Sequence, residues 1–368
     1  MAHIGIDARL IDYRIGGIST YIRRLVAAFD QMTDQPHRLS ILRSRKSSTS
    51  VTTHFAERKI WTPPHHRWER LALSAELFRY RLDVLHSTDF IPPLRGARRH
   101  VINVYDLTFL HYPQHKDRGS QRYYNSQIQR AVKQADHILT ISQASKRDII
   151  DLLDVSPHKV TVHLLGVDER FVPLPERIIT QWRTALDLPE NYVLFVGTFE
   201  PRKNIPLLLE AYADLSTDLR ERFPLLLVGR PGWLFDTTMQ RIEQLQTQGY
   251  PILIRSDISD EALPAIYNMA SVLVLPSFYE GFGIPPLEAM ACGTPTIVSD
   301  ISSLPEVVGD VGLLIDPNDS TSLTTALERA LTDSEWRRSA RARGLHRAKS
   351  FTWEQVAQTT LSVYQQVL

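Results

Sequence analysis

Two glutamates stand in the segment best suited to chemistry, Tyr279–Gly293. Glu280 comes just before a predicted helix and Glu288 lies in its first turns. Gly281 and Gly283 let backbone amides approach a ligand closely, and the amides at a helix start attract anions. Two carboxylates beside an anion site suit a ligand with phosphates and many hydroxyls, such as a nucleotide sugar. The alternative is a glycine-rich turn in which Glu288 is only a favourable charge near a helix start.

A second anion site is predicted where an apolar strand ends at Gly197. Arg202 and Lys203 follow, directly before a helix that we expect to start around Asn204–Pro206. Arginine can hold a phosphate through two N–H groups, and lysine supplies a point charge. Adjacent cations there would neutralise the charge that grows on a departing diphosphate. The alternative is a solvated basic loop.

A pair of glycines, Gly16 and Gly17, leads into a helix predicted over Ser19–Asp30. Backbone amides at such a turn can also bind an anion, although most Gly-Gly pairs are only turns. The spacing differs from the G-x-G-x-x-G pattern of dinucleotide sites, which argues against an NAD enzyme.

Length and composition bound the class of protein that holds these residues. The chain of 368 residues suits two domains, and 43% hydrophobic with 23% charged residues is typical of a globular protein. Its one cysteine, Cys292, excludes an intramolecular disulfide and a cysteine-cage metal site. No signal peptide and no apolar run of about 18 to 20 residues is evident, which predicts a cytoplasmic protein.

The net charge of +1 conceals an uneven distribution. Residues 1–185 contain 28 Lys and Arg against 18 Asp and Glu, whereas residues 186–368 contain 14 against 23. The basic half favours an anionic acceptor or membrane surface, or is simply a solvated surface. The basic residues are scattered and carry no nucleic-acid motif, which argues against nucleic acid as a partner.

Short apolar runs alternate with helix-length stretches in both halves of the chain. Runs such as VLFVG, LLLVG and VLVLP are apolar at nearly every position, which is typical of parallel strands buried on both faces. The expected strands are His3–Ala8, Leu39–Leu42, Asp83–Ser87, Val101–Tyr105, Ile138–Ser142, Val160–Leu164, Tyr192–Gly197, Leu225–Gly229, Ile252–Arg255, Val272–Leu275, Thr296–Ser299 and Gly312–Ile315.

This alternation predicts an α/β protein of two doubly wound, Rossmann-like domains that face each other across a cleft. The glycine and prolines of Gly166–Pro175 mark the boundary. We therefore expect an N-terminal domain over residues 1–170 and a C-terminal domain over 171–350. The last helix, 351–368, is expected to pack back on the first domain.

The chain resembles retaining glycosyltransferases of family 4, which have the GT-B fold. Glu280 and Glu288 match the E-x7-E signature of that family. Further matches follow in the family's order and span nearly the whole chain: the glycine loop Gly16-Gly17-Ile18, the junction from Val167 to Pro173, Arg202-Lys203-Asn204, and Leu304-Pro305-Glu306-Val307.

The resemblance implies a role for each matching residue. Arg202 and Lys203 would bind the donor diphosphate and stabilise the leaving group, while Gly16 and Gly17 would close over the phosphates. Glu288 would bind the ribose hydroxyls. Glu280 would hold the hydroxyls of the transferred sugar, assisted by the loop and amides of Gly281, Phe282, Gly283 and Ile284.

One position departs from the family pattern. The family often has a His before an Asp at the end of a first-domain strand, whereas this chain has Tyr105 before Asp106. A carboxylate at Asp106 would orient the acceptor hydroxyl or support a sugar oxygen, or would only cap the strand end. Tyrosine, with a pKa near 10, is a poor base at neutral pH.

The resemblance thus implies transfer of a hexose with retention at the anomeric carbon, in a mechanism where the departing phosphate accepts the acceptor's proton. GDP-mannose is the expected donor, and a glycan or lipid-pyrophosphate in surface polysaccharide synthesis is the expected acceptor. A UDP-sugar donor, a nucleotide-sugar-binding subunit without activity, and an epimerase or phosphorylase are the alternatives.

A metal is not expected, because no D-x-D motif is present to hold a metal–diphosphate complex. No cofactor is expected besides the nucleotide-sugar donor, which is a substrate. A segment from Trp61 to Tyr80 mixes arginines, among them Arg67 and Arg70, with Trp68 and Phe78. It predicts peripheral contact with the inner face of the membrane, or else the ordinary packing of an amphipathic helix.

Overall fold

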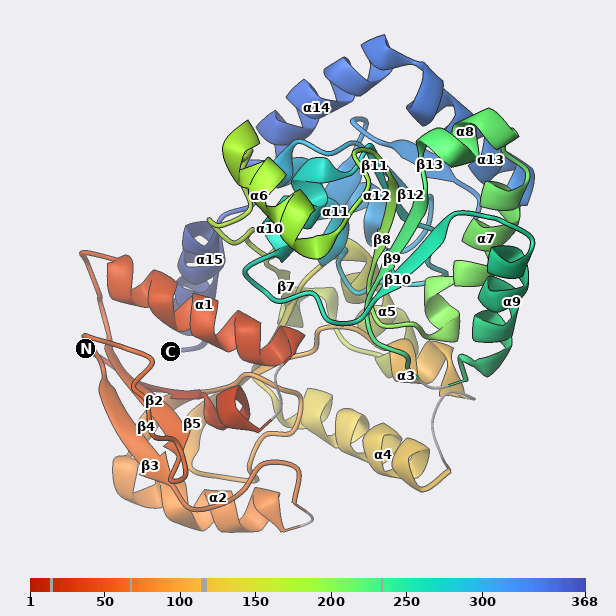
Figure 1. The fold of residues 1–368 in the computed structure, drawn as a ribbon. Coiled ribbons are helices and arrows are strands. Elements are labelled where there is room, and N and C mark those ends of the chain that lie inside the picture. The colour runs from red at the N-terminus through yellow and green to blue at the C-terminus, as the bar shows by residue number, and fades with distance from the viewer. Residues whose placement is uncertain (14–15, 67, 114–117, 233) are drawn as a thin grey trace. The chain divides into compact units, whose positions relative to one another are not determined.

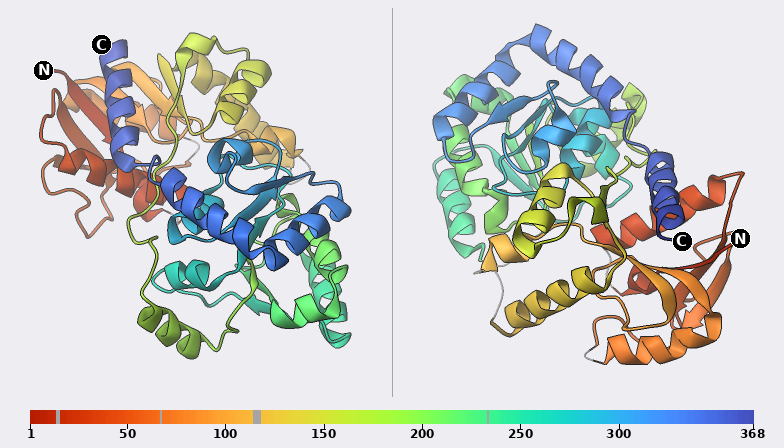
Figure 2. Two further views of the ribbon diagram at one scale, coloured as in Figure 1. Left: turned by 90° about the horizontal axis from the view of Figure 1, so that it is seen from above. Right: turned by 180° about the vertical axis from the view of Figure 1, so that it is seen from behind.

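The computed structural model describes residues 1–13, 16–66, 68–113, 118–232 and 234–368. The chain divides into two compact units (Figures 1 and 2). The first contains Met1–Gly166 with Thr352–Leu368, and the second contains Val167–Phe351. Each unit has its own sheet and core, and each is described by itself.

The first unit is built on a seven-stranded sheet in the order β3-β2-β1-β4-β5-β6-β7, with every neighbouring pair parallel. Its strands are β1 His3–Asp7, β2 Arg38–Ser44, β3 Ala56–Ile60, β4 Leu82–Ser87, β5 Ala97–Asn103, β6 His137–Thr140 and β7 Val160–Val162. Its α-helices are α1 Gly17–Gln31, α2 Glu69–Leu77, α3 Thr108–His111, α4 Arg118–Gln134, α5 Gln143–Leu153 and α15 Trp353–Val367.

The edge strand β3 was missing from the strands predicted by apolar runs. Its sequence, AERKI, has a buried side chain only at Ile60. An edge strand with one partner need not be apolar at every position, and charged side chains protect such an edge from further pairing. The apolar-run criterion therefore misses this kind of strand.

The C-terminal helix α15 belongs to the first unit, although it follows the whole second unit in sequence. It packs beside α1 on one face of the sheet, while α2 covers the other face (Figure 1). Tyr364 Oη lies 2.7 Å from His86 Nδ1, and its ring lies 6.4 Å from that of Phe29. The C-terminal helix thus shares one core with elements from the first hundred residues of the chain.

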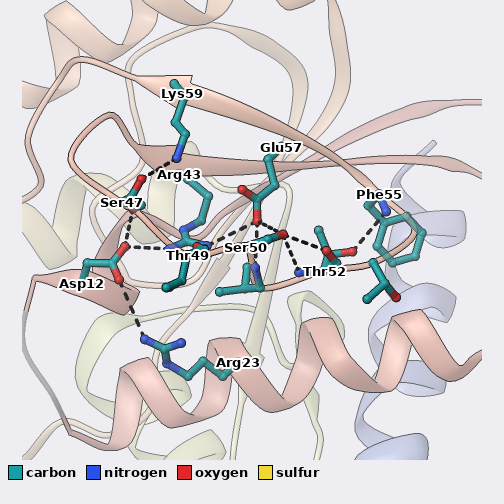
Figure 3. A network of polar contacts seen from close by, with 12 residues as sticks. Asp12, Arg23, Arg43, Ser47, Thr49, Ser50, Thr52, Phe55, Glu57 and Lys59 are labelled. Carbon is teal, nitrogen blue, oxygen red and sulfur yellow. Dashed lines mark hydrogen bonds and ion pairs between the residues drawn. The ribbon is translucent and has the colours of Figure 1, made fainter.

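A serine- and threonine-rich loop between β2 and β3 is held by a fully buried arginine (Figure 3). Arg43 Nη2 lies 2.8 Å from Asp12 Oδ2, and Arg43 Nη1 donates to Thr49 O at 3.2 Å. Glu57 Oε1 accepts from the amide of Val51 at 2.9 Å. These contacts supply partners for the loop backbone, which the local sequence lacks.

The second unit has a six-stranded parallel sheet in the order β10-β9-β8-β11-β12-β13. Its strands are β8 Val193–Val196, β9 Leu225–Val228, β10 Ile252–Arg255, β11 Val272–Leu275, β12 Thr296–Ser299 and β13 Leu313–Ile315. Its α-helices are α6 Glu176–Leu186, α7 Ile205–Ala213, α8 Thr217–Arg222, α9 Asp236–Thr247, α10 Leu263–Met269, α11 Ile284–Cys292, α12 Leu304–Val308, α13 Ser320–Thr332 and α14 Ser334–Ala348.

Both sheets confirm the predicted doubly wound α/β class. In the second unit, α7, α9 and α13 lie together on one side of the sheet, and α10 and α11 lie on the other (Figure 1). The strands β9 and β11 are buried at every position because helices cover both faces. In each unit the strand order reverses next to the first strand, between β1 and β4 and between β8 and β11.

In the described part of the chain, no helix is long and apolar enough to cross a membrane. The segment considered for membrane contact forms α2 and its flanks. Trp61, Trp68, Leu71 and Phe78 have side chains at least half exposed, whereas Leu77 is fully buried in the core. Arg67 lies outside the described residues.

Candidate active site

A buried polar cluster of the second unit lies where its strand order reverses. The strands β8 and β11 are neighbours, with Val193 opposite Val272. Since both are parallel, the loop after β8 and the loop after β11 leave the same edge of the sheet. Ligands of open α/β sheets bind at such reversal points. The topology therefore brings Lys203 and Glu280, 77 positions apart, into contact.

Glu280 is the centre of this cluster. Its Oε1 accepts from Lys203 Nζ at 2.6 Å and from Ser277 Oγ at 2.7 Å, and its Oε2 accepts from Arg202 Nη1 at 2.8 Å. Arg202 also pairs with Glu200 through Nη2 at 2.5 Å. Lys203 and Glu280 are each only 8% exposed. The two predicted phosphate-binding cations thus hold the predicted sugar-binding carboxylate.

This arrangement keeps Glu280 ionised. Burial alone would raise the pKa of its carboxyl group, but the charges of Lys203 and Arg202 outweigh burial and lower the pKa to about 2. With Glu200 also paired to Arg202, two cations face two carboxylates, and the N–H groups of Arg202 and Lys203 are the groups that could donate to a phosphate. The same carboxylate remains a hydrogen-bond acceptor for sugar hydroxyls at any physiological pH.

Two glycines position Lys203 on the β8 side. Gly197 has φ of +156°, and a Cβ atom there would lie 3.5 Å from Lys203 Cε. At Gly229, where φ is +155°, a Cβ atom would lie 1.9 Å from the carbonyl oxygen of Gly197. No side chain fits at Gly229, because the loops after β8 and β9 run against each other there. The close backbone approach fixes the course of the loop that carries Lys203.

The helix α11 starts and stops where the sequence predicts. Gly283 precedes it with φ of +113°, Pro286 lies in its first turn, and Gly293 ends it with φ of +82°. The amides of Phe282, Gly283 and Ile284 have no hydrogen-bond acceptor among the described residues. Such amides at a helix start can donate to an anion or a hydroxyl oxygen.

A pair of serines holds the loop that leads into α11. Ser303 Oγ donates to the carbonyl oxygens of Glu280 and Phe282, at 2.7 and 2.8 Å. Ser302 Oγ accepts from the amide of Glu280 at 3.0 Å. The backbone around Glu280 is therefore fixed from both sides, which orients its carboxylate before any ligand binds.

Glu288, the second glutamate of the pattern, lies on α11 in a different environment. Its Oε2 accepts from Tyr267 Oη of α10 at 2.7 Å. Burial raises the pKa of this carboxyl group to about 7, an effect that the hydrogen bond from Tyr267 and the charge of Arg170 only partly offset. The two glutamates therefore differ in charge state near neutral pH although they share one motif.

The predicted residues of the first unit form a less connected set. Gly17 is the first residue of α1, and a Cβ atom at Gly16 or Gly17 would meet nothing within 4 Å. Asp106 Oδ1 accepts from the amide of Thr108 at 2.9 Å, directly before the short helix α3. Tyr105 Oη donates to Thr88 O at 2.8 Å. The space beside the two glycines is thus open, but the amide of Gly16 already donates to Ser19 Oγ at 3.0 Å, and Asp106 has a capping contact.

The reversal point of the first sheet holds a buried ion cluster that sequence reasoning did not identify. Arg9, 2% exposed, donates to both carboxylate oxygens of Asp7, at 2.9 and 2.7 Å, and to Glu69 at 2.7 Å. Its remaining nitrogen, Nη1, donates to the carbonyl oxygen of Thr62 at 2.9 Å. The adjoining cavity, lined also by His65 and others, measures only about 10 Å³.

Sequence reasoning also missed the partners of the two glutamates. Ser277 follows β11 by two residues, so its position just after an apolar strand was a usable signal. Ser302 and Ser303 directly precede the Leu304-Pro305-Glu306 match. Tyr267 carried no such signal, because it occupies an ordinary apolar position of α10.

Family models match both parts of the chain. The model described as Glycosyltransferase Family 4 matches residues 15–171, and the model described as Glycosyl transferases group 1 matches residues 177–347. The O-antigen chain mannosyltransferase B of Escherichia coli is 37% identical over 291 residues, which cover 77% of this chain and 74% of that protein. The chain belongs to glycosyltransferase family 4. It is a retaining glycosyltransferase of a family that generally works without a metal.

Another relative and two solved structures are also similar to this chain. The serotype-specific mannosyltransferase WbdA of Escherichia coli is 32% identical over 241 residues, covering 64% of this family 4 chain but only 29% of WbdA. Sucrose-phosphate synthase from Thermosynechococcus elongatus has a TM-score of 0.77 at 23% identity, covering 100% of this chain and 99% of that chain. Anabaena HepE, in complex with UDP and glucose, has a TM-score of 0.76 at 18% identity, and the match covers 99% of this chain and 100% of HepE. These neighbours establish the GT-B fold.

Proposed function

We propose that this family 4 enzyme transfers mannose from GDP-mannose to a glycan or lipid-linked acceptor during synthesis of a surface polysaccharide. The observation that carries the transfer is the cluster of Glu280, Lys203 and Arg202 at the β8/β11 reversal point. The choice of mannose rests on the similarity to O-antigen mannosyltransferase B and to WbdA.

The cations and the carboxylate of the cluster are proposed to have different roles. Lys203 and Arg202 bind the donor diphosphate and stabilise the charge that develops when its bond to the anomeric carbon breaks. The departing phosphate oxygen takes the proton of the acceptor hydroxyl as the new carbon–oxygen bond forms on the same face of the sugar. Glu280, kept ionised by its neighbours, accepts hydrogen bonds from the hydroxyls of the transferred sugar.

Glu288 is assigned to the ribose of the donor. Its carboxylate has one acceptor atom bound to Tyr267, which leaves the other oxygen for a ribose hydroxyl. The free amides of Phe282, Gly283 and Ile284 complete the set of donors for the phosphate and sugar oxygens. Asp106, on the first unit, is assigned to the acceptor hydroxyl.

Thermal-shift titration tests the donor. A ligand that binds only the folded protein raises the melting temperature once its concentration exceeds Kd. We expect GDP-mannose and GDP to stabilise the wild-type chain in buffer with EDTA, and UDP-glucose, UDP-N-acetylglucosamine and UDP to have little effect. If only the UDP ligands raised the melting temperature, the donor would be a UDP-sugar and not GDP-mannose. If no ligand raised it, the proposal that this site binds a donor would be overturned. The Lys203→Ala variant must lose the shift.

Charge and exposure support a proposal for the acceptor and the location. The exposed aromatic side chains of Trp61, Trp68 and Phe78 accompany the basic half of the chain. We propose that the enzyme works in the cytoplasm at the inner face of the membrane, where a lipid-pyrophosphate acceptor is presented. Sedimentation with anionic vesicles, compared with a Trp68→Ala/Phe78→Ala variant, tests this contact.

A further inference from the structure

A large cavity opens at the edge of the second sheet opposite to the candidate active site. It measures about 490 Å³ and is lined by residues that precede β8 and β11, among them Asn191 and Ser271. The helices α6 and α14 form its other walls. Parallel strands all start at this edge, so the cavity is separated from the Glu280 cluster by the length of the strands.

Four arginines line this cavity. Arg183 comes from α6, and Arg337, Arg338 and Arg341 come from α14, against the two carboxylates of Glu176 and Glu190. The Nε atom of Arg183 is buried and has no hydrogen-bond acceptor among the described residues. The distance from Arg183 Nη2 to Glu176 Oε1 is 3.9 Å, too long for a hydrogen bond. The lining therefore has excess positive charge and an unused donor.

Two of the arginines are held in place by helix ends. Arg341 Nη1 donates to the carbonyl oxygen of Gly293, just after α11, at 3.2 Å. Arg337 Nη1 donates to that of Ala330, near the end of α13, at 2.7 Å. Each contact uses one of five N–H groups and leaves the others available. Arg338 has no partner within the described ranges, and it is exposed while also lining the cavity.

We propose that this cavity binds a phosphate group carried by a sugar or by a lipid headgroup, at a site separate from the donor site. Arginines bind phosphate oxygens through paired N–H groups, and Arg183 and Arg338 approach the cavity from two different helices. The volume is within the range of small-molecule sites. Ile179, Met269 and Pro295 supply an apolar wall for a sugar ring, and Asn191 supplies an amide for its hydroxyls.

Calorimetric titration of the full chain with mannose 6-phosphate tests the site. We expect saturable binding with Kd below about 1 mM, and at least tenfold weaker binding for Arg183→Ala/Arg338→Ala. Arg343→Ala is the matched control, because Arg343 lies on the same helix but contacts Asp310 and does not line the cavity. Arg338 is exposed, so the single variant Arg338→Ala is expected to fold normally. Weaker binding in this variant would show that the effect does not come from loss of structure in the double variant.

A second pair of measurements separates this site from the donor site and identifies the source of the phosphate. Binding must survive in Lys203→Ala, because Lys203 lies at the opposite edge of the sheet. Vesicles of phosphatidylglycerol, with phosphatidylcholine vesicles as control, test the lipid headgroup. Loss of binding in the cavity variants supports the proposal for whichever ligand binds. Binding of neither ligand, or binding unchanged in the cavity variants, overturns it.

Discussion

The two sheets reverse their strand order in the same way but place opposite charge patterns at the reversal point. In the first unit, one arginine, Arg9, lies between the carboxylates of Asp7 and Glu69. In the second unit, one carboxylate, Glu280, lies between Lys203 and Arg202. The first cluster has one cation for two carboxylates and repels an incoming anion, whereas the second, in which Glu200 also pairs with Arg202, has two cations for two carboxylates and does not. Equivalent topology therefore does not make equivalent sites.

The two clusters also differ in how many of their hydrogen-bond donors are already used by the protein. Arg9 uses Nε, Nη1 and Nη2 on protein oxygens, and burial raises the pKa of Glu69 despite the nearby cation. The second cluster adjoins the helix-start amides of Phe282 and Gly283, which have no acceptor within the described residues. We interpret the first cluster as structural and the second as a binding site.

The largest expected effect is on stability. Arg9→Met leaves two buried carboxylates without their cation, and breaking a buried ion pair from one side costs about 3 to 5 kcal/mol. Urea denaturation followed by circular dichroism measures this loss, with Arg23→Met, at an exposed position of α1, as control. If Arg9→Met were as stable as the control, the structural interpretation of the first cluster would be wrong.

The next effect is on donor binding. Lys203→Ala removes a cation that we propose binds the donor phosphates, and it is expected to lower kcat/KM for the donor at least tenfold, about 1.4 kcal/mol. Initial rates at varied donor concentration measure the change. Lys349→Ala, a lysine on the exposed surface of the same unit, provides the control. Unchanged kinetics in Lys203→Ala would refute the assignment of the second cluster to the donor.

The pH dependence of donor binding tests Glu288. With a pKa of about 7, this carboxyl group is mostly protonated at pH 6, and a proton competes with the ribose hydroxyl. Donor Kd should rise by up to about tenfold per unit as pH falls below 7. Calorimetry from pH 5.5 to 8.5 measures the donor Kd. Glu288→Gln should bind the donor weakly, with a Kd that does not depend on pH. A wild-type Kd independent of pH would contradict the assignment.

The same shift has a stability consequence of defined sign. Because the pKa of Glu288 is raised on folding, its contribution to the free energy of unfolding is fully present below its unfolded value of about 4.5. The contribution decreases as pH rises through 7. Without ligand, the melting temperature of wild type should therefore fall relative to that of Glu288→Gln as pH rises from 4.5 to 7.

The smallest expected effect separates the two roles of Asp106. Asp106→Asn keeps an oxygen to accept from the amide of Thr108, so the melting temperature should hardly change. If the carboxylate orients the acceptor, kcat should fall several-fold while donor Kd stays constant. A kcat equal to that of wild type would leave Asp106 as a helix cap only.

Much of the second site was predictable because its residues lie at the ends of apolar strands. The turn at Gly283, Pro286 in the first turn and the stop at Gly293 follow from local backbone chemistry, and all three are confirmed. The edge strand β3 was not predicted, because its charged residues lack the apolar run. The charge cluster around Arg9 was not predicted either, since Asp7, Arg9 and Glu69 carry no local signal of contact.

The sequence by itself determined the two α/β units, their apolar strands and the motif residues Arg202, Lys203, Glu280 and Glu288, because periodicity, turn chemistry and motif spacing are local properties. Only the tertiary structure decided which charges meet. Lys203 and Glu280 contact each other because β8 and β11 are neighbours at the strand reversal, and Glu288 meets Tyr267 because α10 packs against α11. Electrostatic effects depend on distance and burial, and neither is defined until the chain is folded.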